Sequence, residues 1–353
     1  MKILLVIRKF GLGGTERRME ALYKHISASH ECKKYELTDV PTEYVLDGQT
    51  AFTKDTYKKK WQCLKNEIRA YQPDVIHCFD LETSIYCKTI LLFNRKTGLI
   101  AGFGSSVIES KIIRSLIQLP FFQPDIFICN SKKGVKYLKE TLGIKTAIEF
   151  IPNGLSATDF SEQFRTTKYF PDNNPIIGYI GKFDSNKRGD RMMDIALELK
   201  EHPLRPNFIL VGTGPLLQEA KKRAQETGME KRILFTGLTE KAHLIARSFN
   251  AAVLCSDLEG FPNVLVEYMA MGIPFVTTDA GDSGDIVTQH QCGILVEKFS
   301  AGEFAKAIIN LMENETLRKT LSTLGKKTFT EQYTIETMSK RYLEIYQRML
   351  KLN

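Results

Sequence analysis

The chain has 353 residues, of which 43% are hydrophobic and 25% charged, and its formal net charge is +8. This apolar fraction can bury a core, which excludes a disordered chain, and the length suits two domains. No apolar run approaches the roughly 18 residues that span a bilayer. The seven cysteines lack the C-x-x-C spacing of a zinc site, so we expect a cytoplasmic protein without a disulfide framework.

The basic excess lies entirely in the first half of the chain. Residues 1–170 contain 26 basic and 18 acidic residues, whereas residues 171–353 contain 23 of each. This asymmetry indicates that the first half meets an anionic partner, such as nucleic acid, a membrane surface or a phosphate-bearing substrate. The alternative is a charged surface that only keeps the protein soluble.

Short apolar runs alternate with amphipathic helical patterns along the whole chain. Such uninterrupted runs are typical of parallel strands covered on both faces, and their alternation with helices predicts an α/β fold. The predicted strands are Ile3–Ile7, Val75–Cys78, Leu99–Gly102, Ile126–Cys129, Ile148–Pro152, Ile176–Ile180, Phe208–Val211, Ile233–Thr236, Ala251–Cys255, Pro274–Thr277 and Gly293–Val296. Predicted helices include Thr15–Ile26, Gly302–Met312 and Glu336–Leu350.

The polar segment Phe164–Pro175 interrupts this alternation and contains two prolines. We place a domain boundary there. The prediction is two doubly wound, Rossmann-like domains that face a cleft, a first domain at residues 1–166 and a second at residues 172–335. The last helix, in residues 336–353, is expected to pack back on the first domain. Ligands bind beyond the carboxyl ends of strands in such sheets.

Each predicted domain has a glycine turn after its first strand. The turn at residues 10–16 reads FGLGGTE, and its glycines and helix start could approach a phosphate, although the spacing fails as a dinucleotide fingerprint. The turn at residues 181–190 reads GKFDSNKRGD, and its cations could clamp a diphosphate. Ordinary turns and solvated loops explain each piece equally well when it is taken alone.

The stretch Ser256–Pro274 is the most specific. Glu259 stands before the turn Gly260–Pro262, and Glu267 follows inside a helix that begins near Pro262 or Asn263. The helix start would face a phosphate, and the Glu267 carboxylate could accept two vicinal ribose hydroxyls. Glu259 could accept sugar hydroxyls beyond the phosphate. The alternative is a pair of acidic residues that stabilise a helix dipole.

These residues resemble the E-x7-E region of retaining glycosyltransferases of family four, which have the two-domain GT-B fold. The resemblance extends along nearly the whole chain, and its order and spacing make it specific. The further matching motifs are Gly13–Glu16, Pro73–His77, Ile151–Gly154, Gly181–Gly189 and Asp279–Val287.

The resemblance implies a nucleotide-sugar donor held mainly by the second domain, without a metal or another cofactor. It implies that Lys182 and Arg188, with Lys187, bind the diphosphate, that Glu259 binds the transferred sugar, and that Glu267 binds the ribose. The remaining implied donor contacts are the first-domain glycines Gly13 and Gly14, the turn and helix-start residues Gly260, Phe261, Pro262, Asn263 and Val264, and, near the base, Leu238.

The chain departs from the family pattern at several positions, which include Lys182, Arg188, Asp282 and Asp285. Lys182 stands where arginine is usual, so a bidentate phosphate contact becomes a point-charge contact. The family's first-domain histidine is missing from residues 99–106, and Ser105, Ser106 and Glu109 are acceptor-side candidates to replace it. His77 is expected to be a structural residue at a strand end.

The expected reaction transfers a sugar, UDP- or GDP-linked, to an acceptor hydroxyl with retention at the anomeric carbon. Without an obvious carboxylate nucleophile, the resemblance favours front-face attack, in which the leaving phosphate accepts the acceptor's proton. The alternatives are an inactive sugar-nucleotide or glycan-binding module and a GT-B sugar-nucleotide epimerase. An NAD-dependent oxidoreductase is less favoured because of the glycine spacing.

The acceptor is expected to be a glycan or lipid-linked saccharide in surface polysaccharide synthesis. The segments Lys58–Trp61 and Lys111–Phe122 place cations beside apolar side chains. They could bind an anionic membrane peripherally at the inner face of the plasma membrane, or pack on the sheet with their cations solvated. Nucleic acid is disfavoured as a partner because aromatic side chains do not alternate with the cations.

Overall fold

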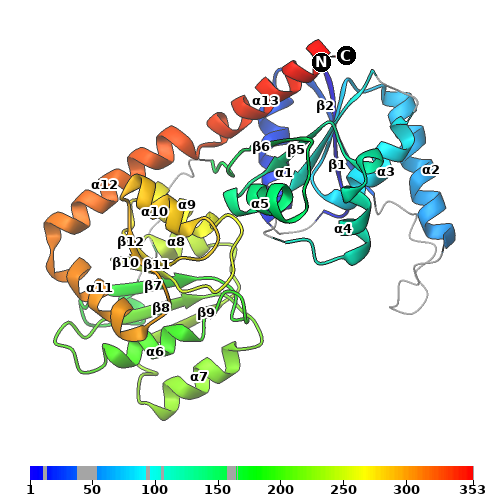
Figure 1. Ribbon diagram of the computed structural model, residues 1–353. Helices are drawn as coiled ribbons and strands as arrows, with labels where there is room; N and C mark the ends of the chain where they lie inside the picture. The colour runs from blue at the N-terminus through cyan, green and yellow to red at the C-terminus, as the bar shows by residue number, and fades with distance from the viewer. Residues whose placement is uncertain are drawn as a thin grey trace. The chain divides into compact units, whose positions relative to one another are not determined.

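The chain folds into two compact units, each built on its own parallel sheet (Figure 1). The structure is a computed structural model that describes residues 1–10, 14–37, 54–92, 96–104, 107–156, 164 and 166–352. The first unit contains Met1–Gly154 together with Ile335–Asn353, and the second contains Leu155–Thr334.

The first unit has a six-stranded parallel sheet in the order β2-β1-β3-β4-β5-β6. Its strands are β1 (Lys2–Ile7), β2 (Glu31–Glu36), β3 (Val75–Cys78), β4 (Gly98–Phe103), β5 (Ile126–Cys129) and β6 (Ala147–Phe150). Its helices are α1 (Gly14–Ile26), α2 (Lys54–Tyr71), α3 (Leu81–Leu91), α4 (Lys111–Gln118), α5 (Lys132–Lys136) and α13 (Ile335–Leu352), with the short turns η2 (Pro120–Phe122) and η3 (Tyr137–Thr141).

Both faces of this sheet are covered because successive strand side chains point to opposite sides. In β1, Ile3 and Leu5 pack with residues of α1 and α13, whereas Leu4 and Val6 pack with residues of α2 and α3. Figure 1 shows helices on both sides of the sheet. An uninterrupted apolar run is therefore what a strand in this position requires.

The second unit has a six-stranded parallel sheet in the order β12-β11-β10-β7-β8-β9. Its strands are β7 (Ile176–Ile180), β8 (Asn207–Val211), β9 (Ile233–Gly237), β10 (Ala251–Leu254), β11 (Phe275–Thr278) and β12 (Ile294–Val296). Its helices are α6 (Arg191–Glu198), α7 (Leu217–Glu226), α8 (Ala242–Ala246), α9 (Asn263–Met271), α10 (Ser283–His290), α11 (Ala301–Glu313) and α12 (Glu315–Gln332), with the turn η4 (Thr166–Lys168).

Helices α6, α7 and α11 cover one face of the second sheet, and α8, α9, α10 and α12 cover the other. Side-chain caps mark where helices begin: Ser300 accepts a backbone N–H at the start of α11, and Asn314 does so at α12. The predicted α/β class with two doubly wound sheets is confirmed.

The domain boundary differs from the prediction. The chain passes into the second unit at Leu155, whose N–H donates to the Tyr333 carbonyl oxygen at 2.9 Å. Phe170 is buried in the core of the second unit, and Asp172 accepts a hydrogen bond from the Asn207 side chain. The polar segment thus packs on the second unit, and the boundary predicted between residues 166 and 172 is wrong.

His77 lies in the interior of the first unit, at a position where α13 covers β3. Its ring is fully buried, stacks on Phe79 with centroids 4.2 Å apart, and shares a hydrogen bond with the Tyr346 hydroxyl at 2.7 Å. Burial, and secondarily the Arg18 charge, hold the pKa of His77 well below its ordinary value.

We expect His77 to make the protein sensitive to acid. Because its folded pKa is depressed, the unfolded chain binds a proton below about pH 6.5 that the folded chain refuses. Stability is therefore lost as the pH falls below that value, by up to about 1.4 kcal/mol per pH unit for one such group. Urea unfolding between pH 8 and pH 5 should show a shallower loss for His77→Asn; equal slopes would contradict this assignment.

Candidate functional site

The candidate site lies where the topology of the second sheet reverses. Strands β7 and β10 are neighbours, but the chain continues from β7 to β8 on one side and from β10 to β11 on the other. Loops leaving the carboxyl ends of two such strands diverge and leave a crevice for a ligand. The glycine loop at residues 181–190 follows β7, and the loop at residues 255–262 follows β10.

Backbone and side-chain contacts join these two loops. The Asn186 carbonyl oxygen accepts the N–H groups of Asp257 at 2.8 Å and Leu258 at 3.3 Å. The Asp257 carboxylate receives Arg191 at 2.7 Å and Arg188 at 3.2 Å. The glycine loop therefore fixes the position of the segment that carries Glu259.

Glu259 is a buried carboxylate with a partner on each oxygen. It is 4% exposed, and its Oε1 accepts the Ser256 hydroxyl at 2.7 Å. Its Oε2 pairs with the Lys187 ammonium. Lys187, a predicted diphosphate contact, is thus paired with the predicted sugar contact, and Ser256 is a positioning residue that the sequence analysis missed.

A buried tyrosine, Tyr179, forms hydrogen bonds to the backbone of the glycine loop. The Tyr179 hydroxyl donates to the carbonyl oxygens of Lys182 at 2.8 Å and Lys187 at 3.2 Å. Burial raises the pKa of Tyr179 well above its ordinary value, so the hydroxyl keeps the proton that it donates. The Lys182 side chain is exposed, and no described residue pairs with its ammonium.

Arg188 is engaged by two carboxylates. Its guanidinium contacts Asp190 at 2.8 Å and Asp257 at 3.2 Å. These contacts raise the pKa of Arg188, and the hydrogen bond to Asp190 has the largest effect. Sequence reasoning could not find the second contact, because Asp257 lies 69 positions away. The contact with Asp257 is the more exposed of the two, so it is the one for which a bound phosphate would compete.

Helix α9 begins directly beside this network. Pro262 occupies its N-cap, Phe261 is buried, and Glu267 lies in the second turn, partly exposed. The positive end of the helix dipole thus lies close in sequence to Glu259. Leu238, the predicted base contact, directly follows β9 and is 79% exposed.

Gly281 supports the Glu259 loop through a close contact that only glycine allows. Its φ is +59°, and a Cβ there would lie 2.3 Å from the Gly260 carbonyl oxygen and 2.5 Å from the Glu259 Cβ.

We expect Gly281→Ala to lower the free energy of unfolding by at least about 1–2 kcal/mol, from the backbone conformation alone. Gly302→Ala, at a helical position with open space around it, is the control and should not destabilise. Equal urea midpoints for the two variants would contradict this account.

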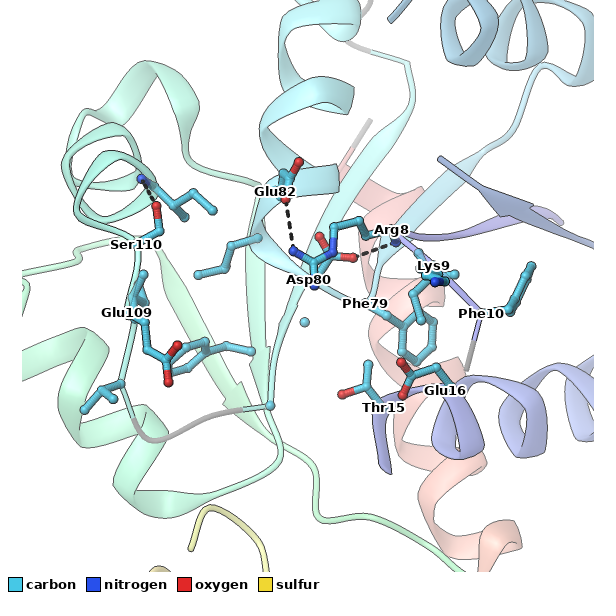
Figure 2. Close-up of a pocket in the computed structure, with 18 residues that line it drawn as sticks. Arg8, Lys9, Phe10, Thr15, Glu16, Phe79, Asp80, Glu82, Glu109 and Ser110 are labelled. Atoms are coloured by element: carbon cyan, nitrogen blue, oxygen red, sulfur yellow. Dashed lines mark hydrogen bonds and ion pairs between the residues drawn. The ribbon is translucent and has the colours of Figure 1, made fainter. Parts of the chain in front are cut away.

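The first unit has its own cavity, of about 740 Å³, at the carboxyl ends of β1, β3 and β4. Figure 2 shows Glu109 and Glu16 on opposite sides of it. Asp80 in its wall accepts N–H groups of Arg8 and Thr83, both at 2.9 Å, and burial raises the pKa of its carboxyl.

The residues predicted for the first domain have different outcomes. Glu109, an acceptor-side candidate, lines the cavity, and Gly14, a predicted donor contact, begins α1. The other three lie outside the described residues: Ser105, Ser106 and Gly13.

The described residues contain neither a metal-binding cluster nor a membrane-spanning helix. No group of three or more histidine, cysteine, aspartate or glutamate residues in that part of the chain is arranged to hold a metal ion. No helix within it is long and apolar enough to cross a bilayer.

Part of the second unit matches a known family model. Residues 160–328 match the family model for glycosyl transferases group 1. This group 1 region contains both loops of the candidate site, including Glu259. Ser256 and Lys187, the partners of the Glu259 carboxylate, lie in the same region.

Relatives extend the similarity beyond the group 1 region. The chain is 30% identical over 182 residues to the Vi polysaccharide biosynthesis protein VipC/TviE of Salmonella typhi, over 49% of this chain and only 31% of that protein. It is 24% identical over 346 residues, 93% of each chain, to the GalNAc-alpha-(1->4)-GalNAc-alpha-(1->3)-diNAcBac-PP-undecaprenol alpha-1,4-N-acetyl-D-galactosaminyltransferase of Campylobacter jejuni.

A solved structure is similar over both units. Anabaena HepE, crystallised in complex with UDP, superposes with a TM-score of 0.78 at 16% identity, covering 99% of this chain and 100% of HepE. At this identity the likeness shows the fold, and the predicted GT-B fold is confirmed.

Proposed function

We propose that the chain is a retaining glycosyltransferase that moves a sugar from a nucleoside diphosphate to an acceptor hydroxyl without a metal. The observation that carries the proposal is the buried Glu259, held by Ser256 and Lys187 beside the start of α9. The group 1 match over this region supports the same assignment.

In the proposed reaction the acceptor oxygen bonds to the anomeric carbon on the face from which the phosphate leaves. The bond from that carbon to the phosphate oxygen breaks, and the phosphate takes the acceptor's proton. The protein supplies orientation and charges placed where negative charge develops on the diphosphate. Glu259, held on both oxygens, would orient the sugar hydroxyls.

The other donor contacts are proposed from their positions around Glu259. Lys182 is exposed and has no ion pair with any described residue, so it is available to the diphosphate, and Lys187 would bridge the diphosphate and Glu259. Arg188 would join them by exchanging its exposed contact with Asp257. Glu267 would bind the ribose. The α9 start and Leu238, near the base, complete the donor contacts proposed within the second unit.

The acceptor is proposed to be a saccharide or lipid-linked saccharide used in surface polysaccharide synthesis. The names of the Salmonella and Campylobacter relatives support this class. Glu109, which lines the first-unit cavity, is the acceptor-side candidate among the described residues.

Thermal unfolding of the full chain with UDP, GDP and their sugars tests the proposal, because a bound ligand raises the melting temperature. We expect one nucleotide to stabilise wild type and to lose most of this effect with Glu267→Gln. A transfer assay with the stabilising donor should then release nucleotide only when acceptor is present. Binding without any turnover would favour a binding module, and sugar interconversion without acceptor would favour an epimerase.

We also propose peripheral binding to an anionic membrane through α4 and η2, at the inner face of the plasma membrane. Ile112 is 73% exposed, Leu119 52% and Phe121 54%, beside the cation Lys111. The other predicted segment, Lys58–Trp61, packs differently: the Trp61 indole N–H donates to Thr89 of α3 at 2.9 Å. The exposed apolar side chains therefore favour the α4 segment.

Sedimentation with phosphatidylglycerol vesicles at low salt should carry the wild-type chain into the pellet, and high salt should release it. Replacing Ile112 and Phe121 together by serine should remove most of the binding, because the apolar contact is lost. Leu238→Ser, an exposed apolar change in the second unit, is the control. Absence of wild-type sedimentation at low salt would rule out the membrane proposal.

A further inference from the structure

Arg18 of α1 is a buried cation without a carboxylate partner among the described residues. It is 3% exposed. Its Nη1 donates to the Asn153 side-chain oxygen at 3.4 Å, and its guanidinium carbon lies 5.4 Å from the centre of the Phe79 ring. Its Nε and Nη2 have no hydrogen-bond partner in the part of the chain that the structure describes. Burying an unpaired charge is costly, so these nitrogens need an explanation.

The unpaired Nη2 lies near Gly104, which directly follows β4. The position that a Cβ would take on Gly104 is 3.9 Å from Nη2, 3.3 Å from the Thr15 hydroxyl and 3.9 Å from the Asn130 side-chain oxygen. That oxygen is also buried and has no hydrogen-bond partner among the described residues. Because Gly104 carries no side chain, no atom of its own fills the position beside these three polar groups.

Gly104 and Thr15 both line the first-unit cavity. Figure 2 shows Thr15 and Phe79 on the same side of the cavity, and Arg18 packs on the Phe79 ring. Helix α1 begins at Gly14, so the positive end of its dipole adds to the same region. A guanidinium, a hydroxyl and a helix start together form a set of donors suited to phosphate or carboxylate oxygens.

Two carboxylates also line the cavity. Glu16 and Glu109 lie on its two sides, and carboxylates accept hydrogen bonds from hydroxyl groups. We propose that this cavity binds a hydroxyl-rich molecule that carries an anionic group, a carboxylate or a phosphate, seated against Gly104 and stabilised by Arg18. If this molecule is the acceptor, it is an acidic or phosphorylated sugar. The assignment as acceptor rests on the proposed transferase function, whereas the proposal of a binding site does not.

Titration of the full chain with glucuronate, glucose 1-phosphate and neutral glucose tests the site. One of the anionic sugars should bind wild type at least about tenfold more tightly than glucose, the effect of one charge-assisted hydrogen bond. Arg18→Met should abolish this preference and raise the melting temperature of the ligand-free protein, because an unpaired buried charge is removed. Gly104→Ala keeps Arg18 but fills the proposed position, and it should also abolish the preference.

Titration in the presence of UDP identifies the source of the anion. Simultaneous binding supports a separate sugar site, whereas displacement by UDP supports the anion site and assigns it to the nucleotide diphosphate. Equal affinity for glucose and both anionic sugars, or a preference that survives in both variants, would overturn the proposal. UDP binding to wild type, measured alone, shows separately whether the proposed donor function fails.

Discussion

Replacing Glu259 by glutamine is expected to slow sugar transfer by about 100-fold or more, the loss typical when one preorganised polar contact to the reacting group is removed. Glutamine has nearly the same shape as glutamate. Its side-chain oxygen can still accept the hydrogen bond that the Ser256 hydroxyl donates to Glu259 at 2.7 Å in the wild-type structure. It removes the negative charge that pairs with Lys187. The expected fall is therefore in kcat/KM for the donor, with the fold retained.

The assay compares nucleotide release by Glu259→Gln and by Glu313→Gln, a change at an exposed residue at the end of α11. The control should match wild type. Melting temperatures of all three proteins show whether they are equally folded. Transfer by Glu259→Gln within about threefold of wild type would remove Glu259 from the proposed reaction.

Replacing Lys187 by methionine is expected to reduce both stability and donor affinity. The change leaves one oxygen of the buried Glu259 without its partner. Since the Lys187 side chain is 34% exposed, water can replace part of the lost contact, and we expect a loss of about 1–3 kcal/mol in unfolding free energy. Urea unfolding and UDP titration measure the two effects.

Lys182→Met is the matched control, because Lys182 lies in the same loop but is exposed and pairs with no described residue. It should weaken UDP binding without changing the unfolding free energy. The double variant Lys187→Met, Glu259→Gln should recover part of the stability, because no charge is then left unpaired. A Lys187→Met protein as stable as wild type would contradict the pairing of Lys187 with Glu259.

The fold class could be predicted because buried parallel strands need uninterrupted apolar runs, and each predicted run lies in or overlaps a strand. Strand β2 could not be found in this way. It lies at the sheet edge, its sequence ECKKYE is largely polar, and it is recognised only by its pairing with β1. Polarity does not locate the domain boundary, because the polar segment still contributes Phe170 to the core of the second unit.

The loops of the candidate site could also be predicted, since glycines, cations and a helix start leave local signals. Their partners could not. Tyr179 lies inside an apolar strand run and shows no sign of its hydrogen bonds to the glycine loop. Asp257 and Arg188 meet only through the fold. Ser256 had one available signal: it precedes Glu259 by three positions in the same loop.

Hydrogen–deuterium exchange of the full chain with and without UDP or GDP tests most directly that a nucleoside diphosphate binds at the carboxyl edge of the second sheet. We expect slower amide exchange in residues 181–190 and 256–267 when the preferred nucleotide is bound. Unchanged exchange in both loops while nucleotide is bound, or binding of neither nucleotide, would contradict it.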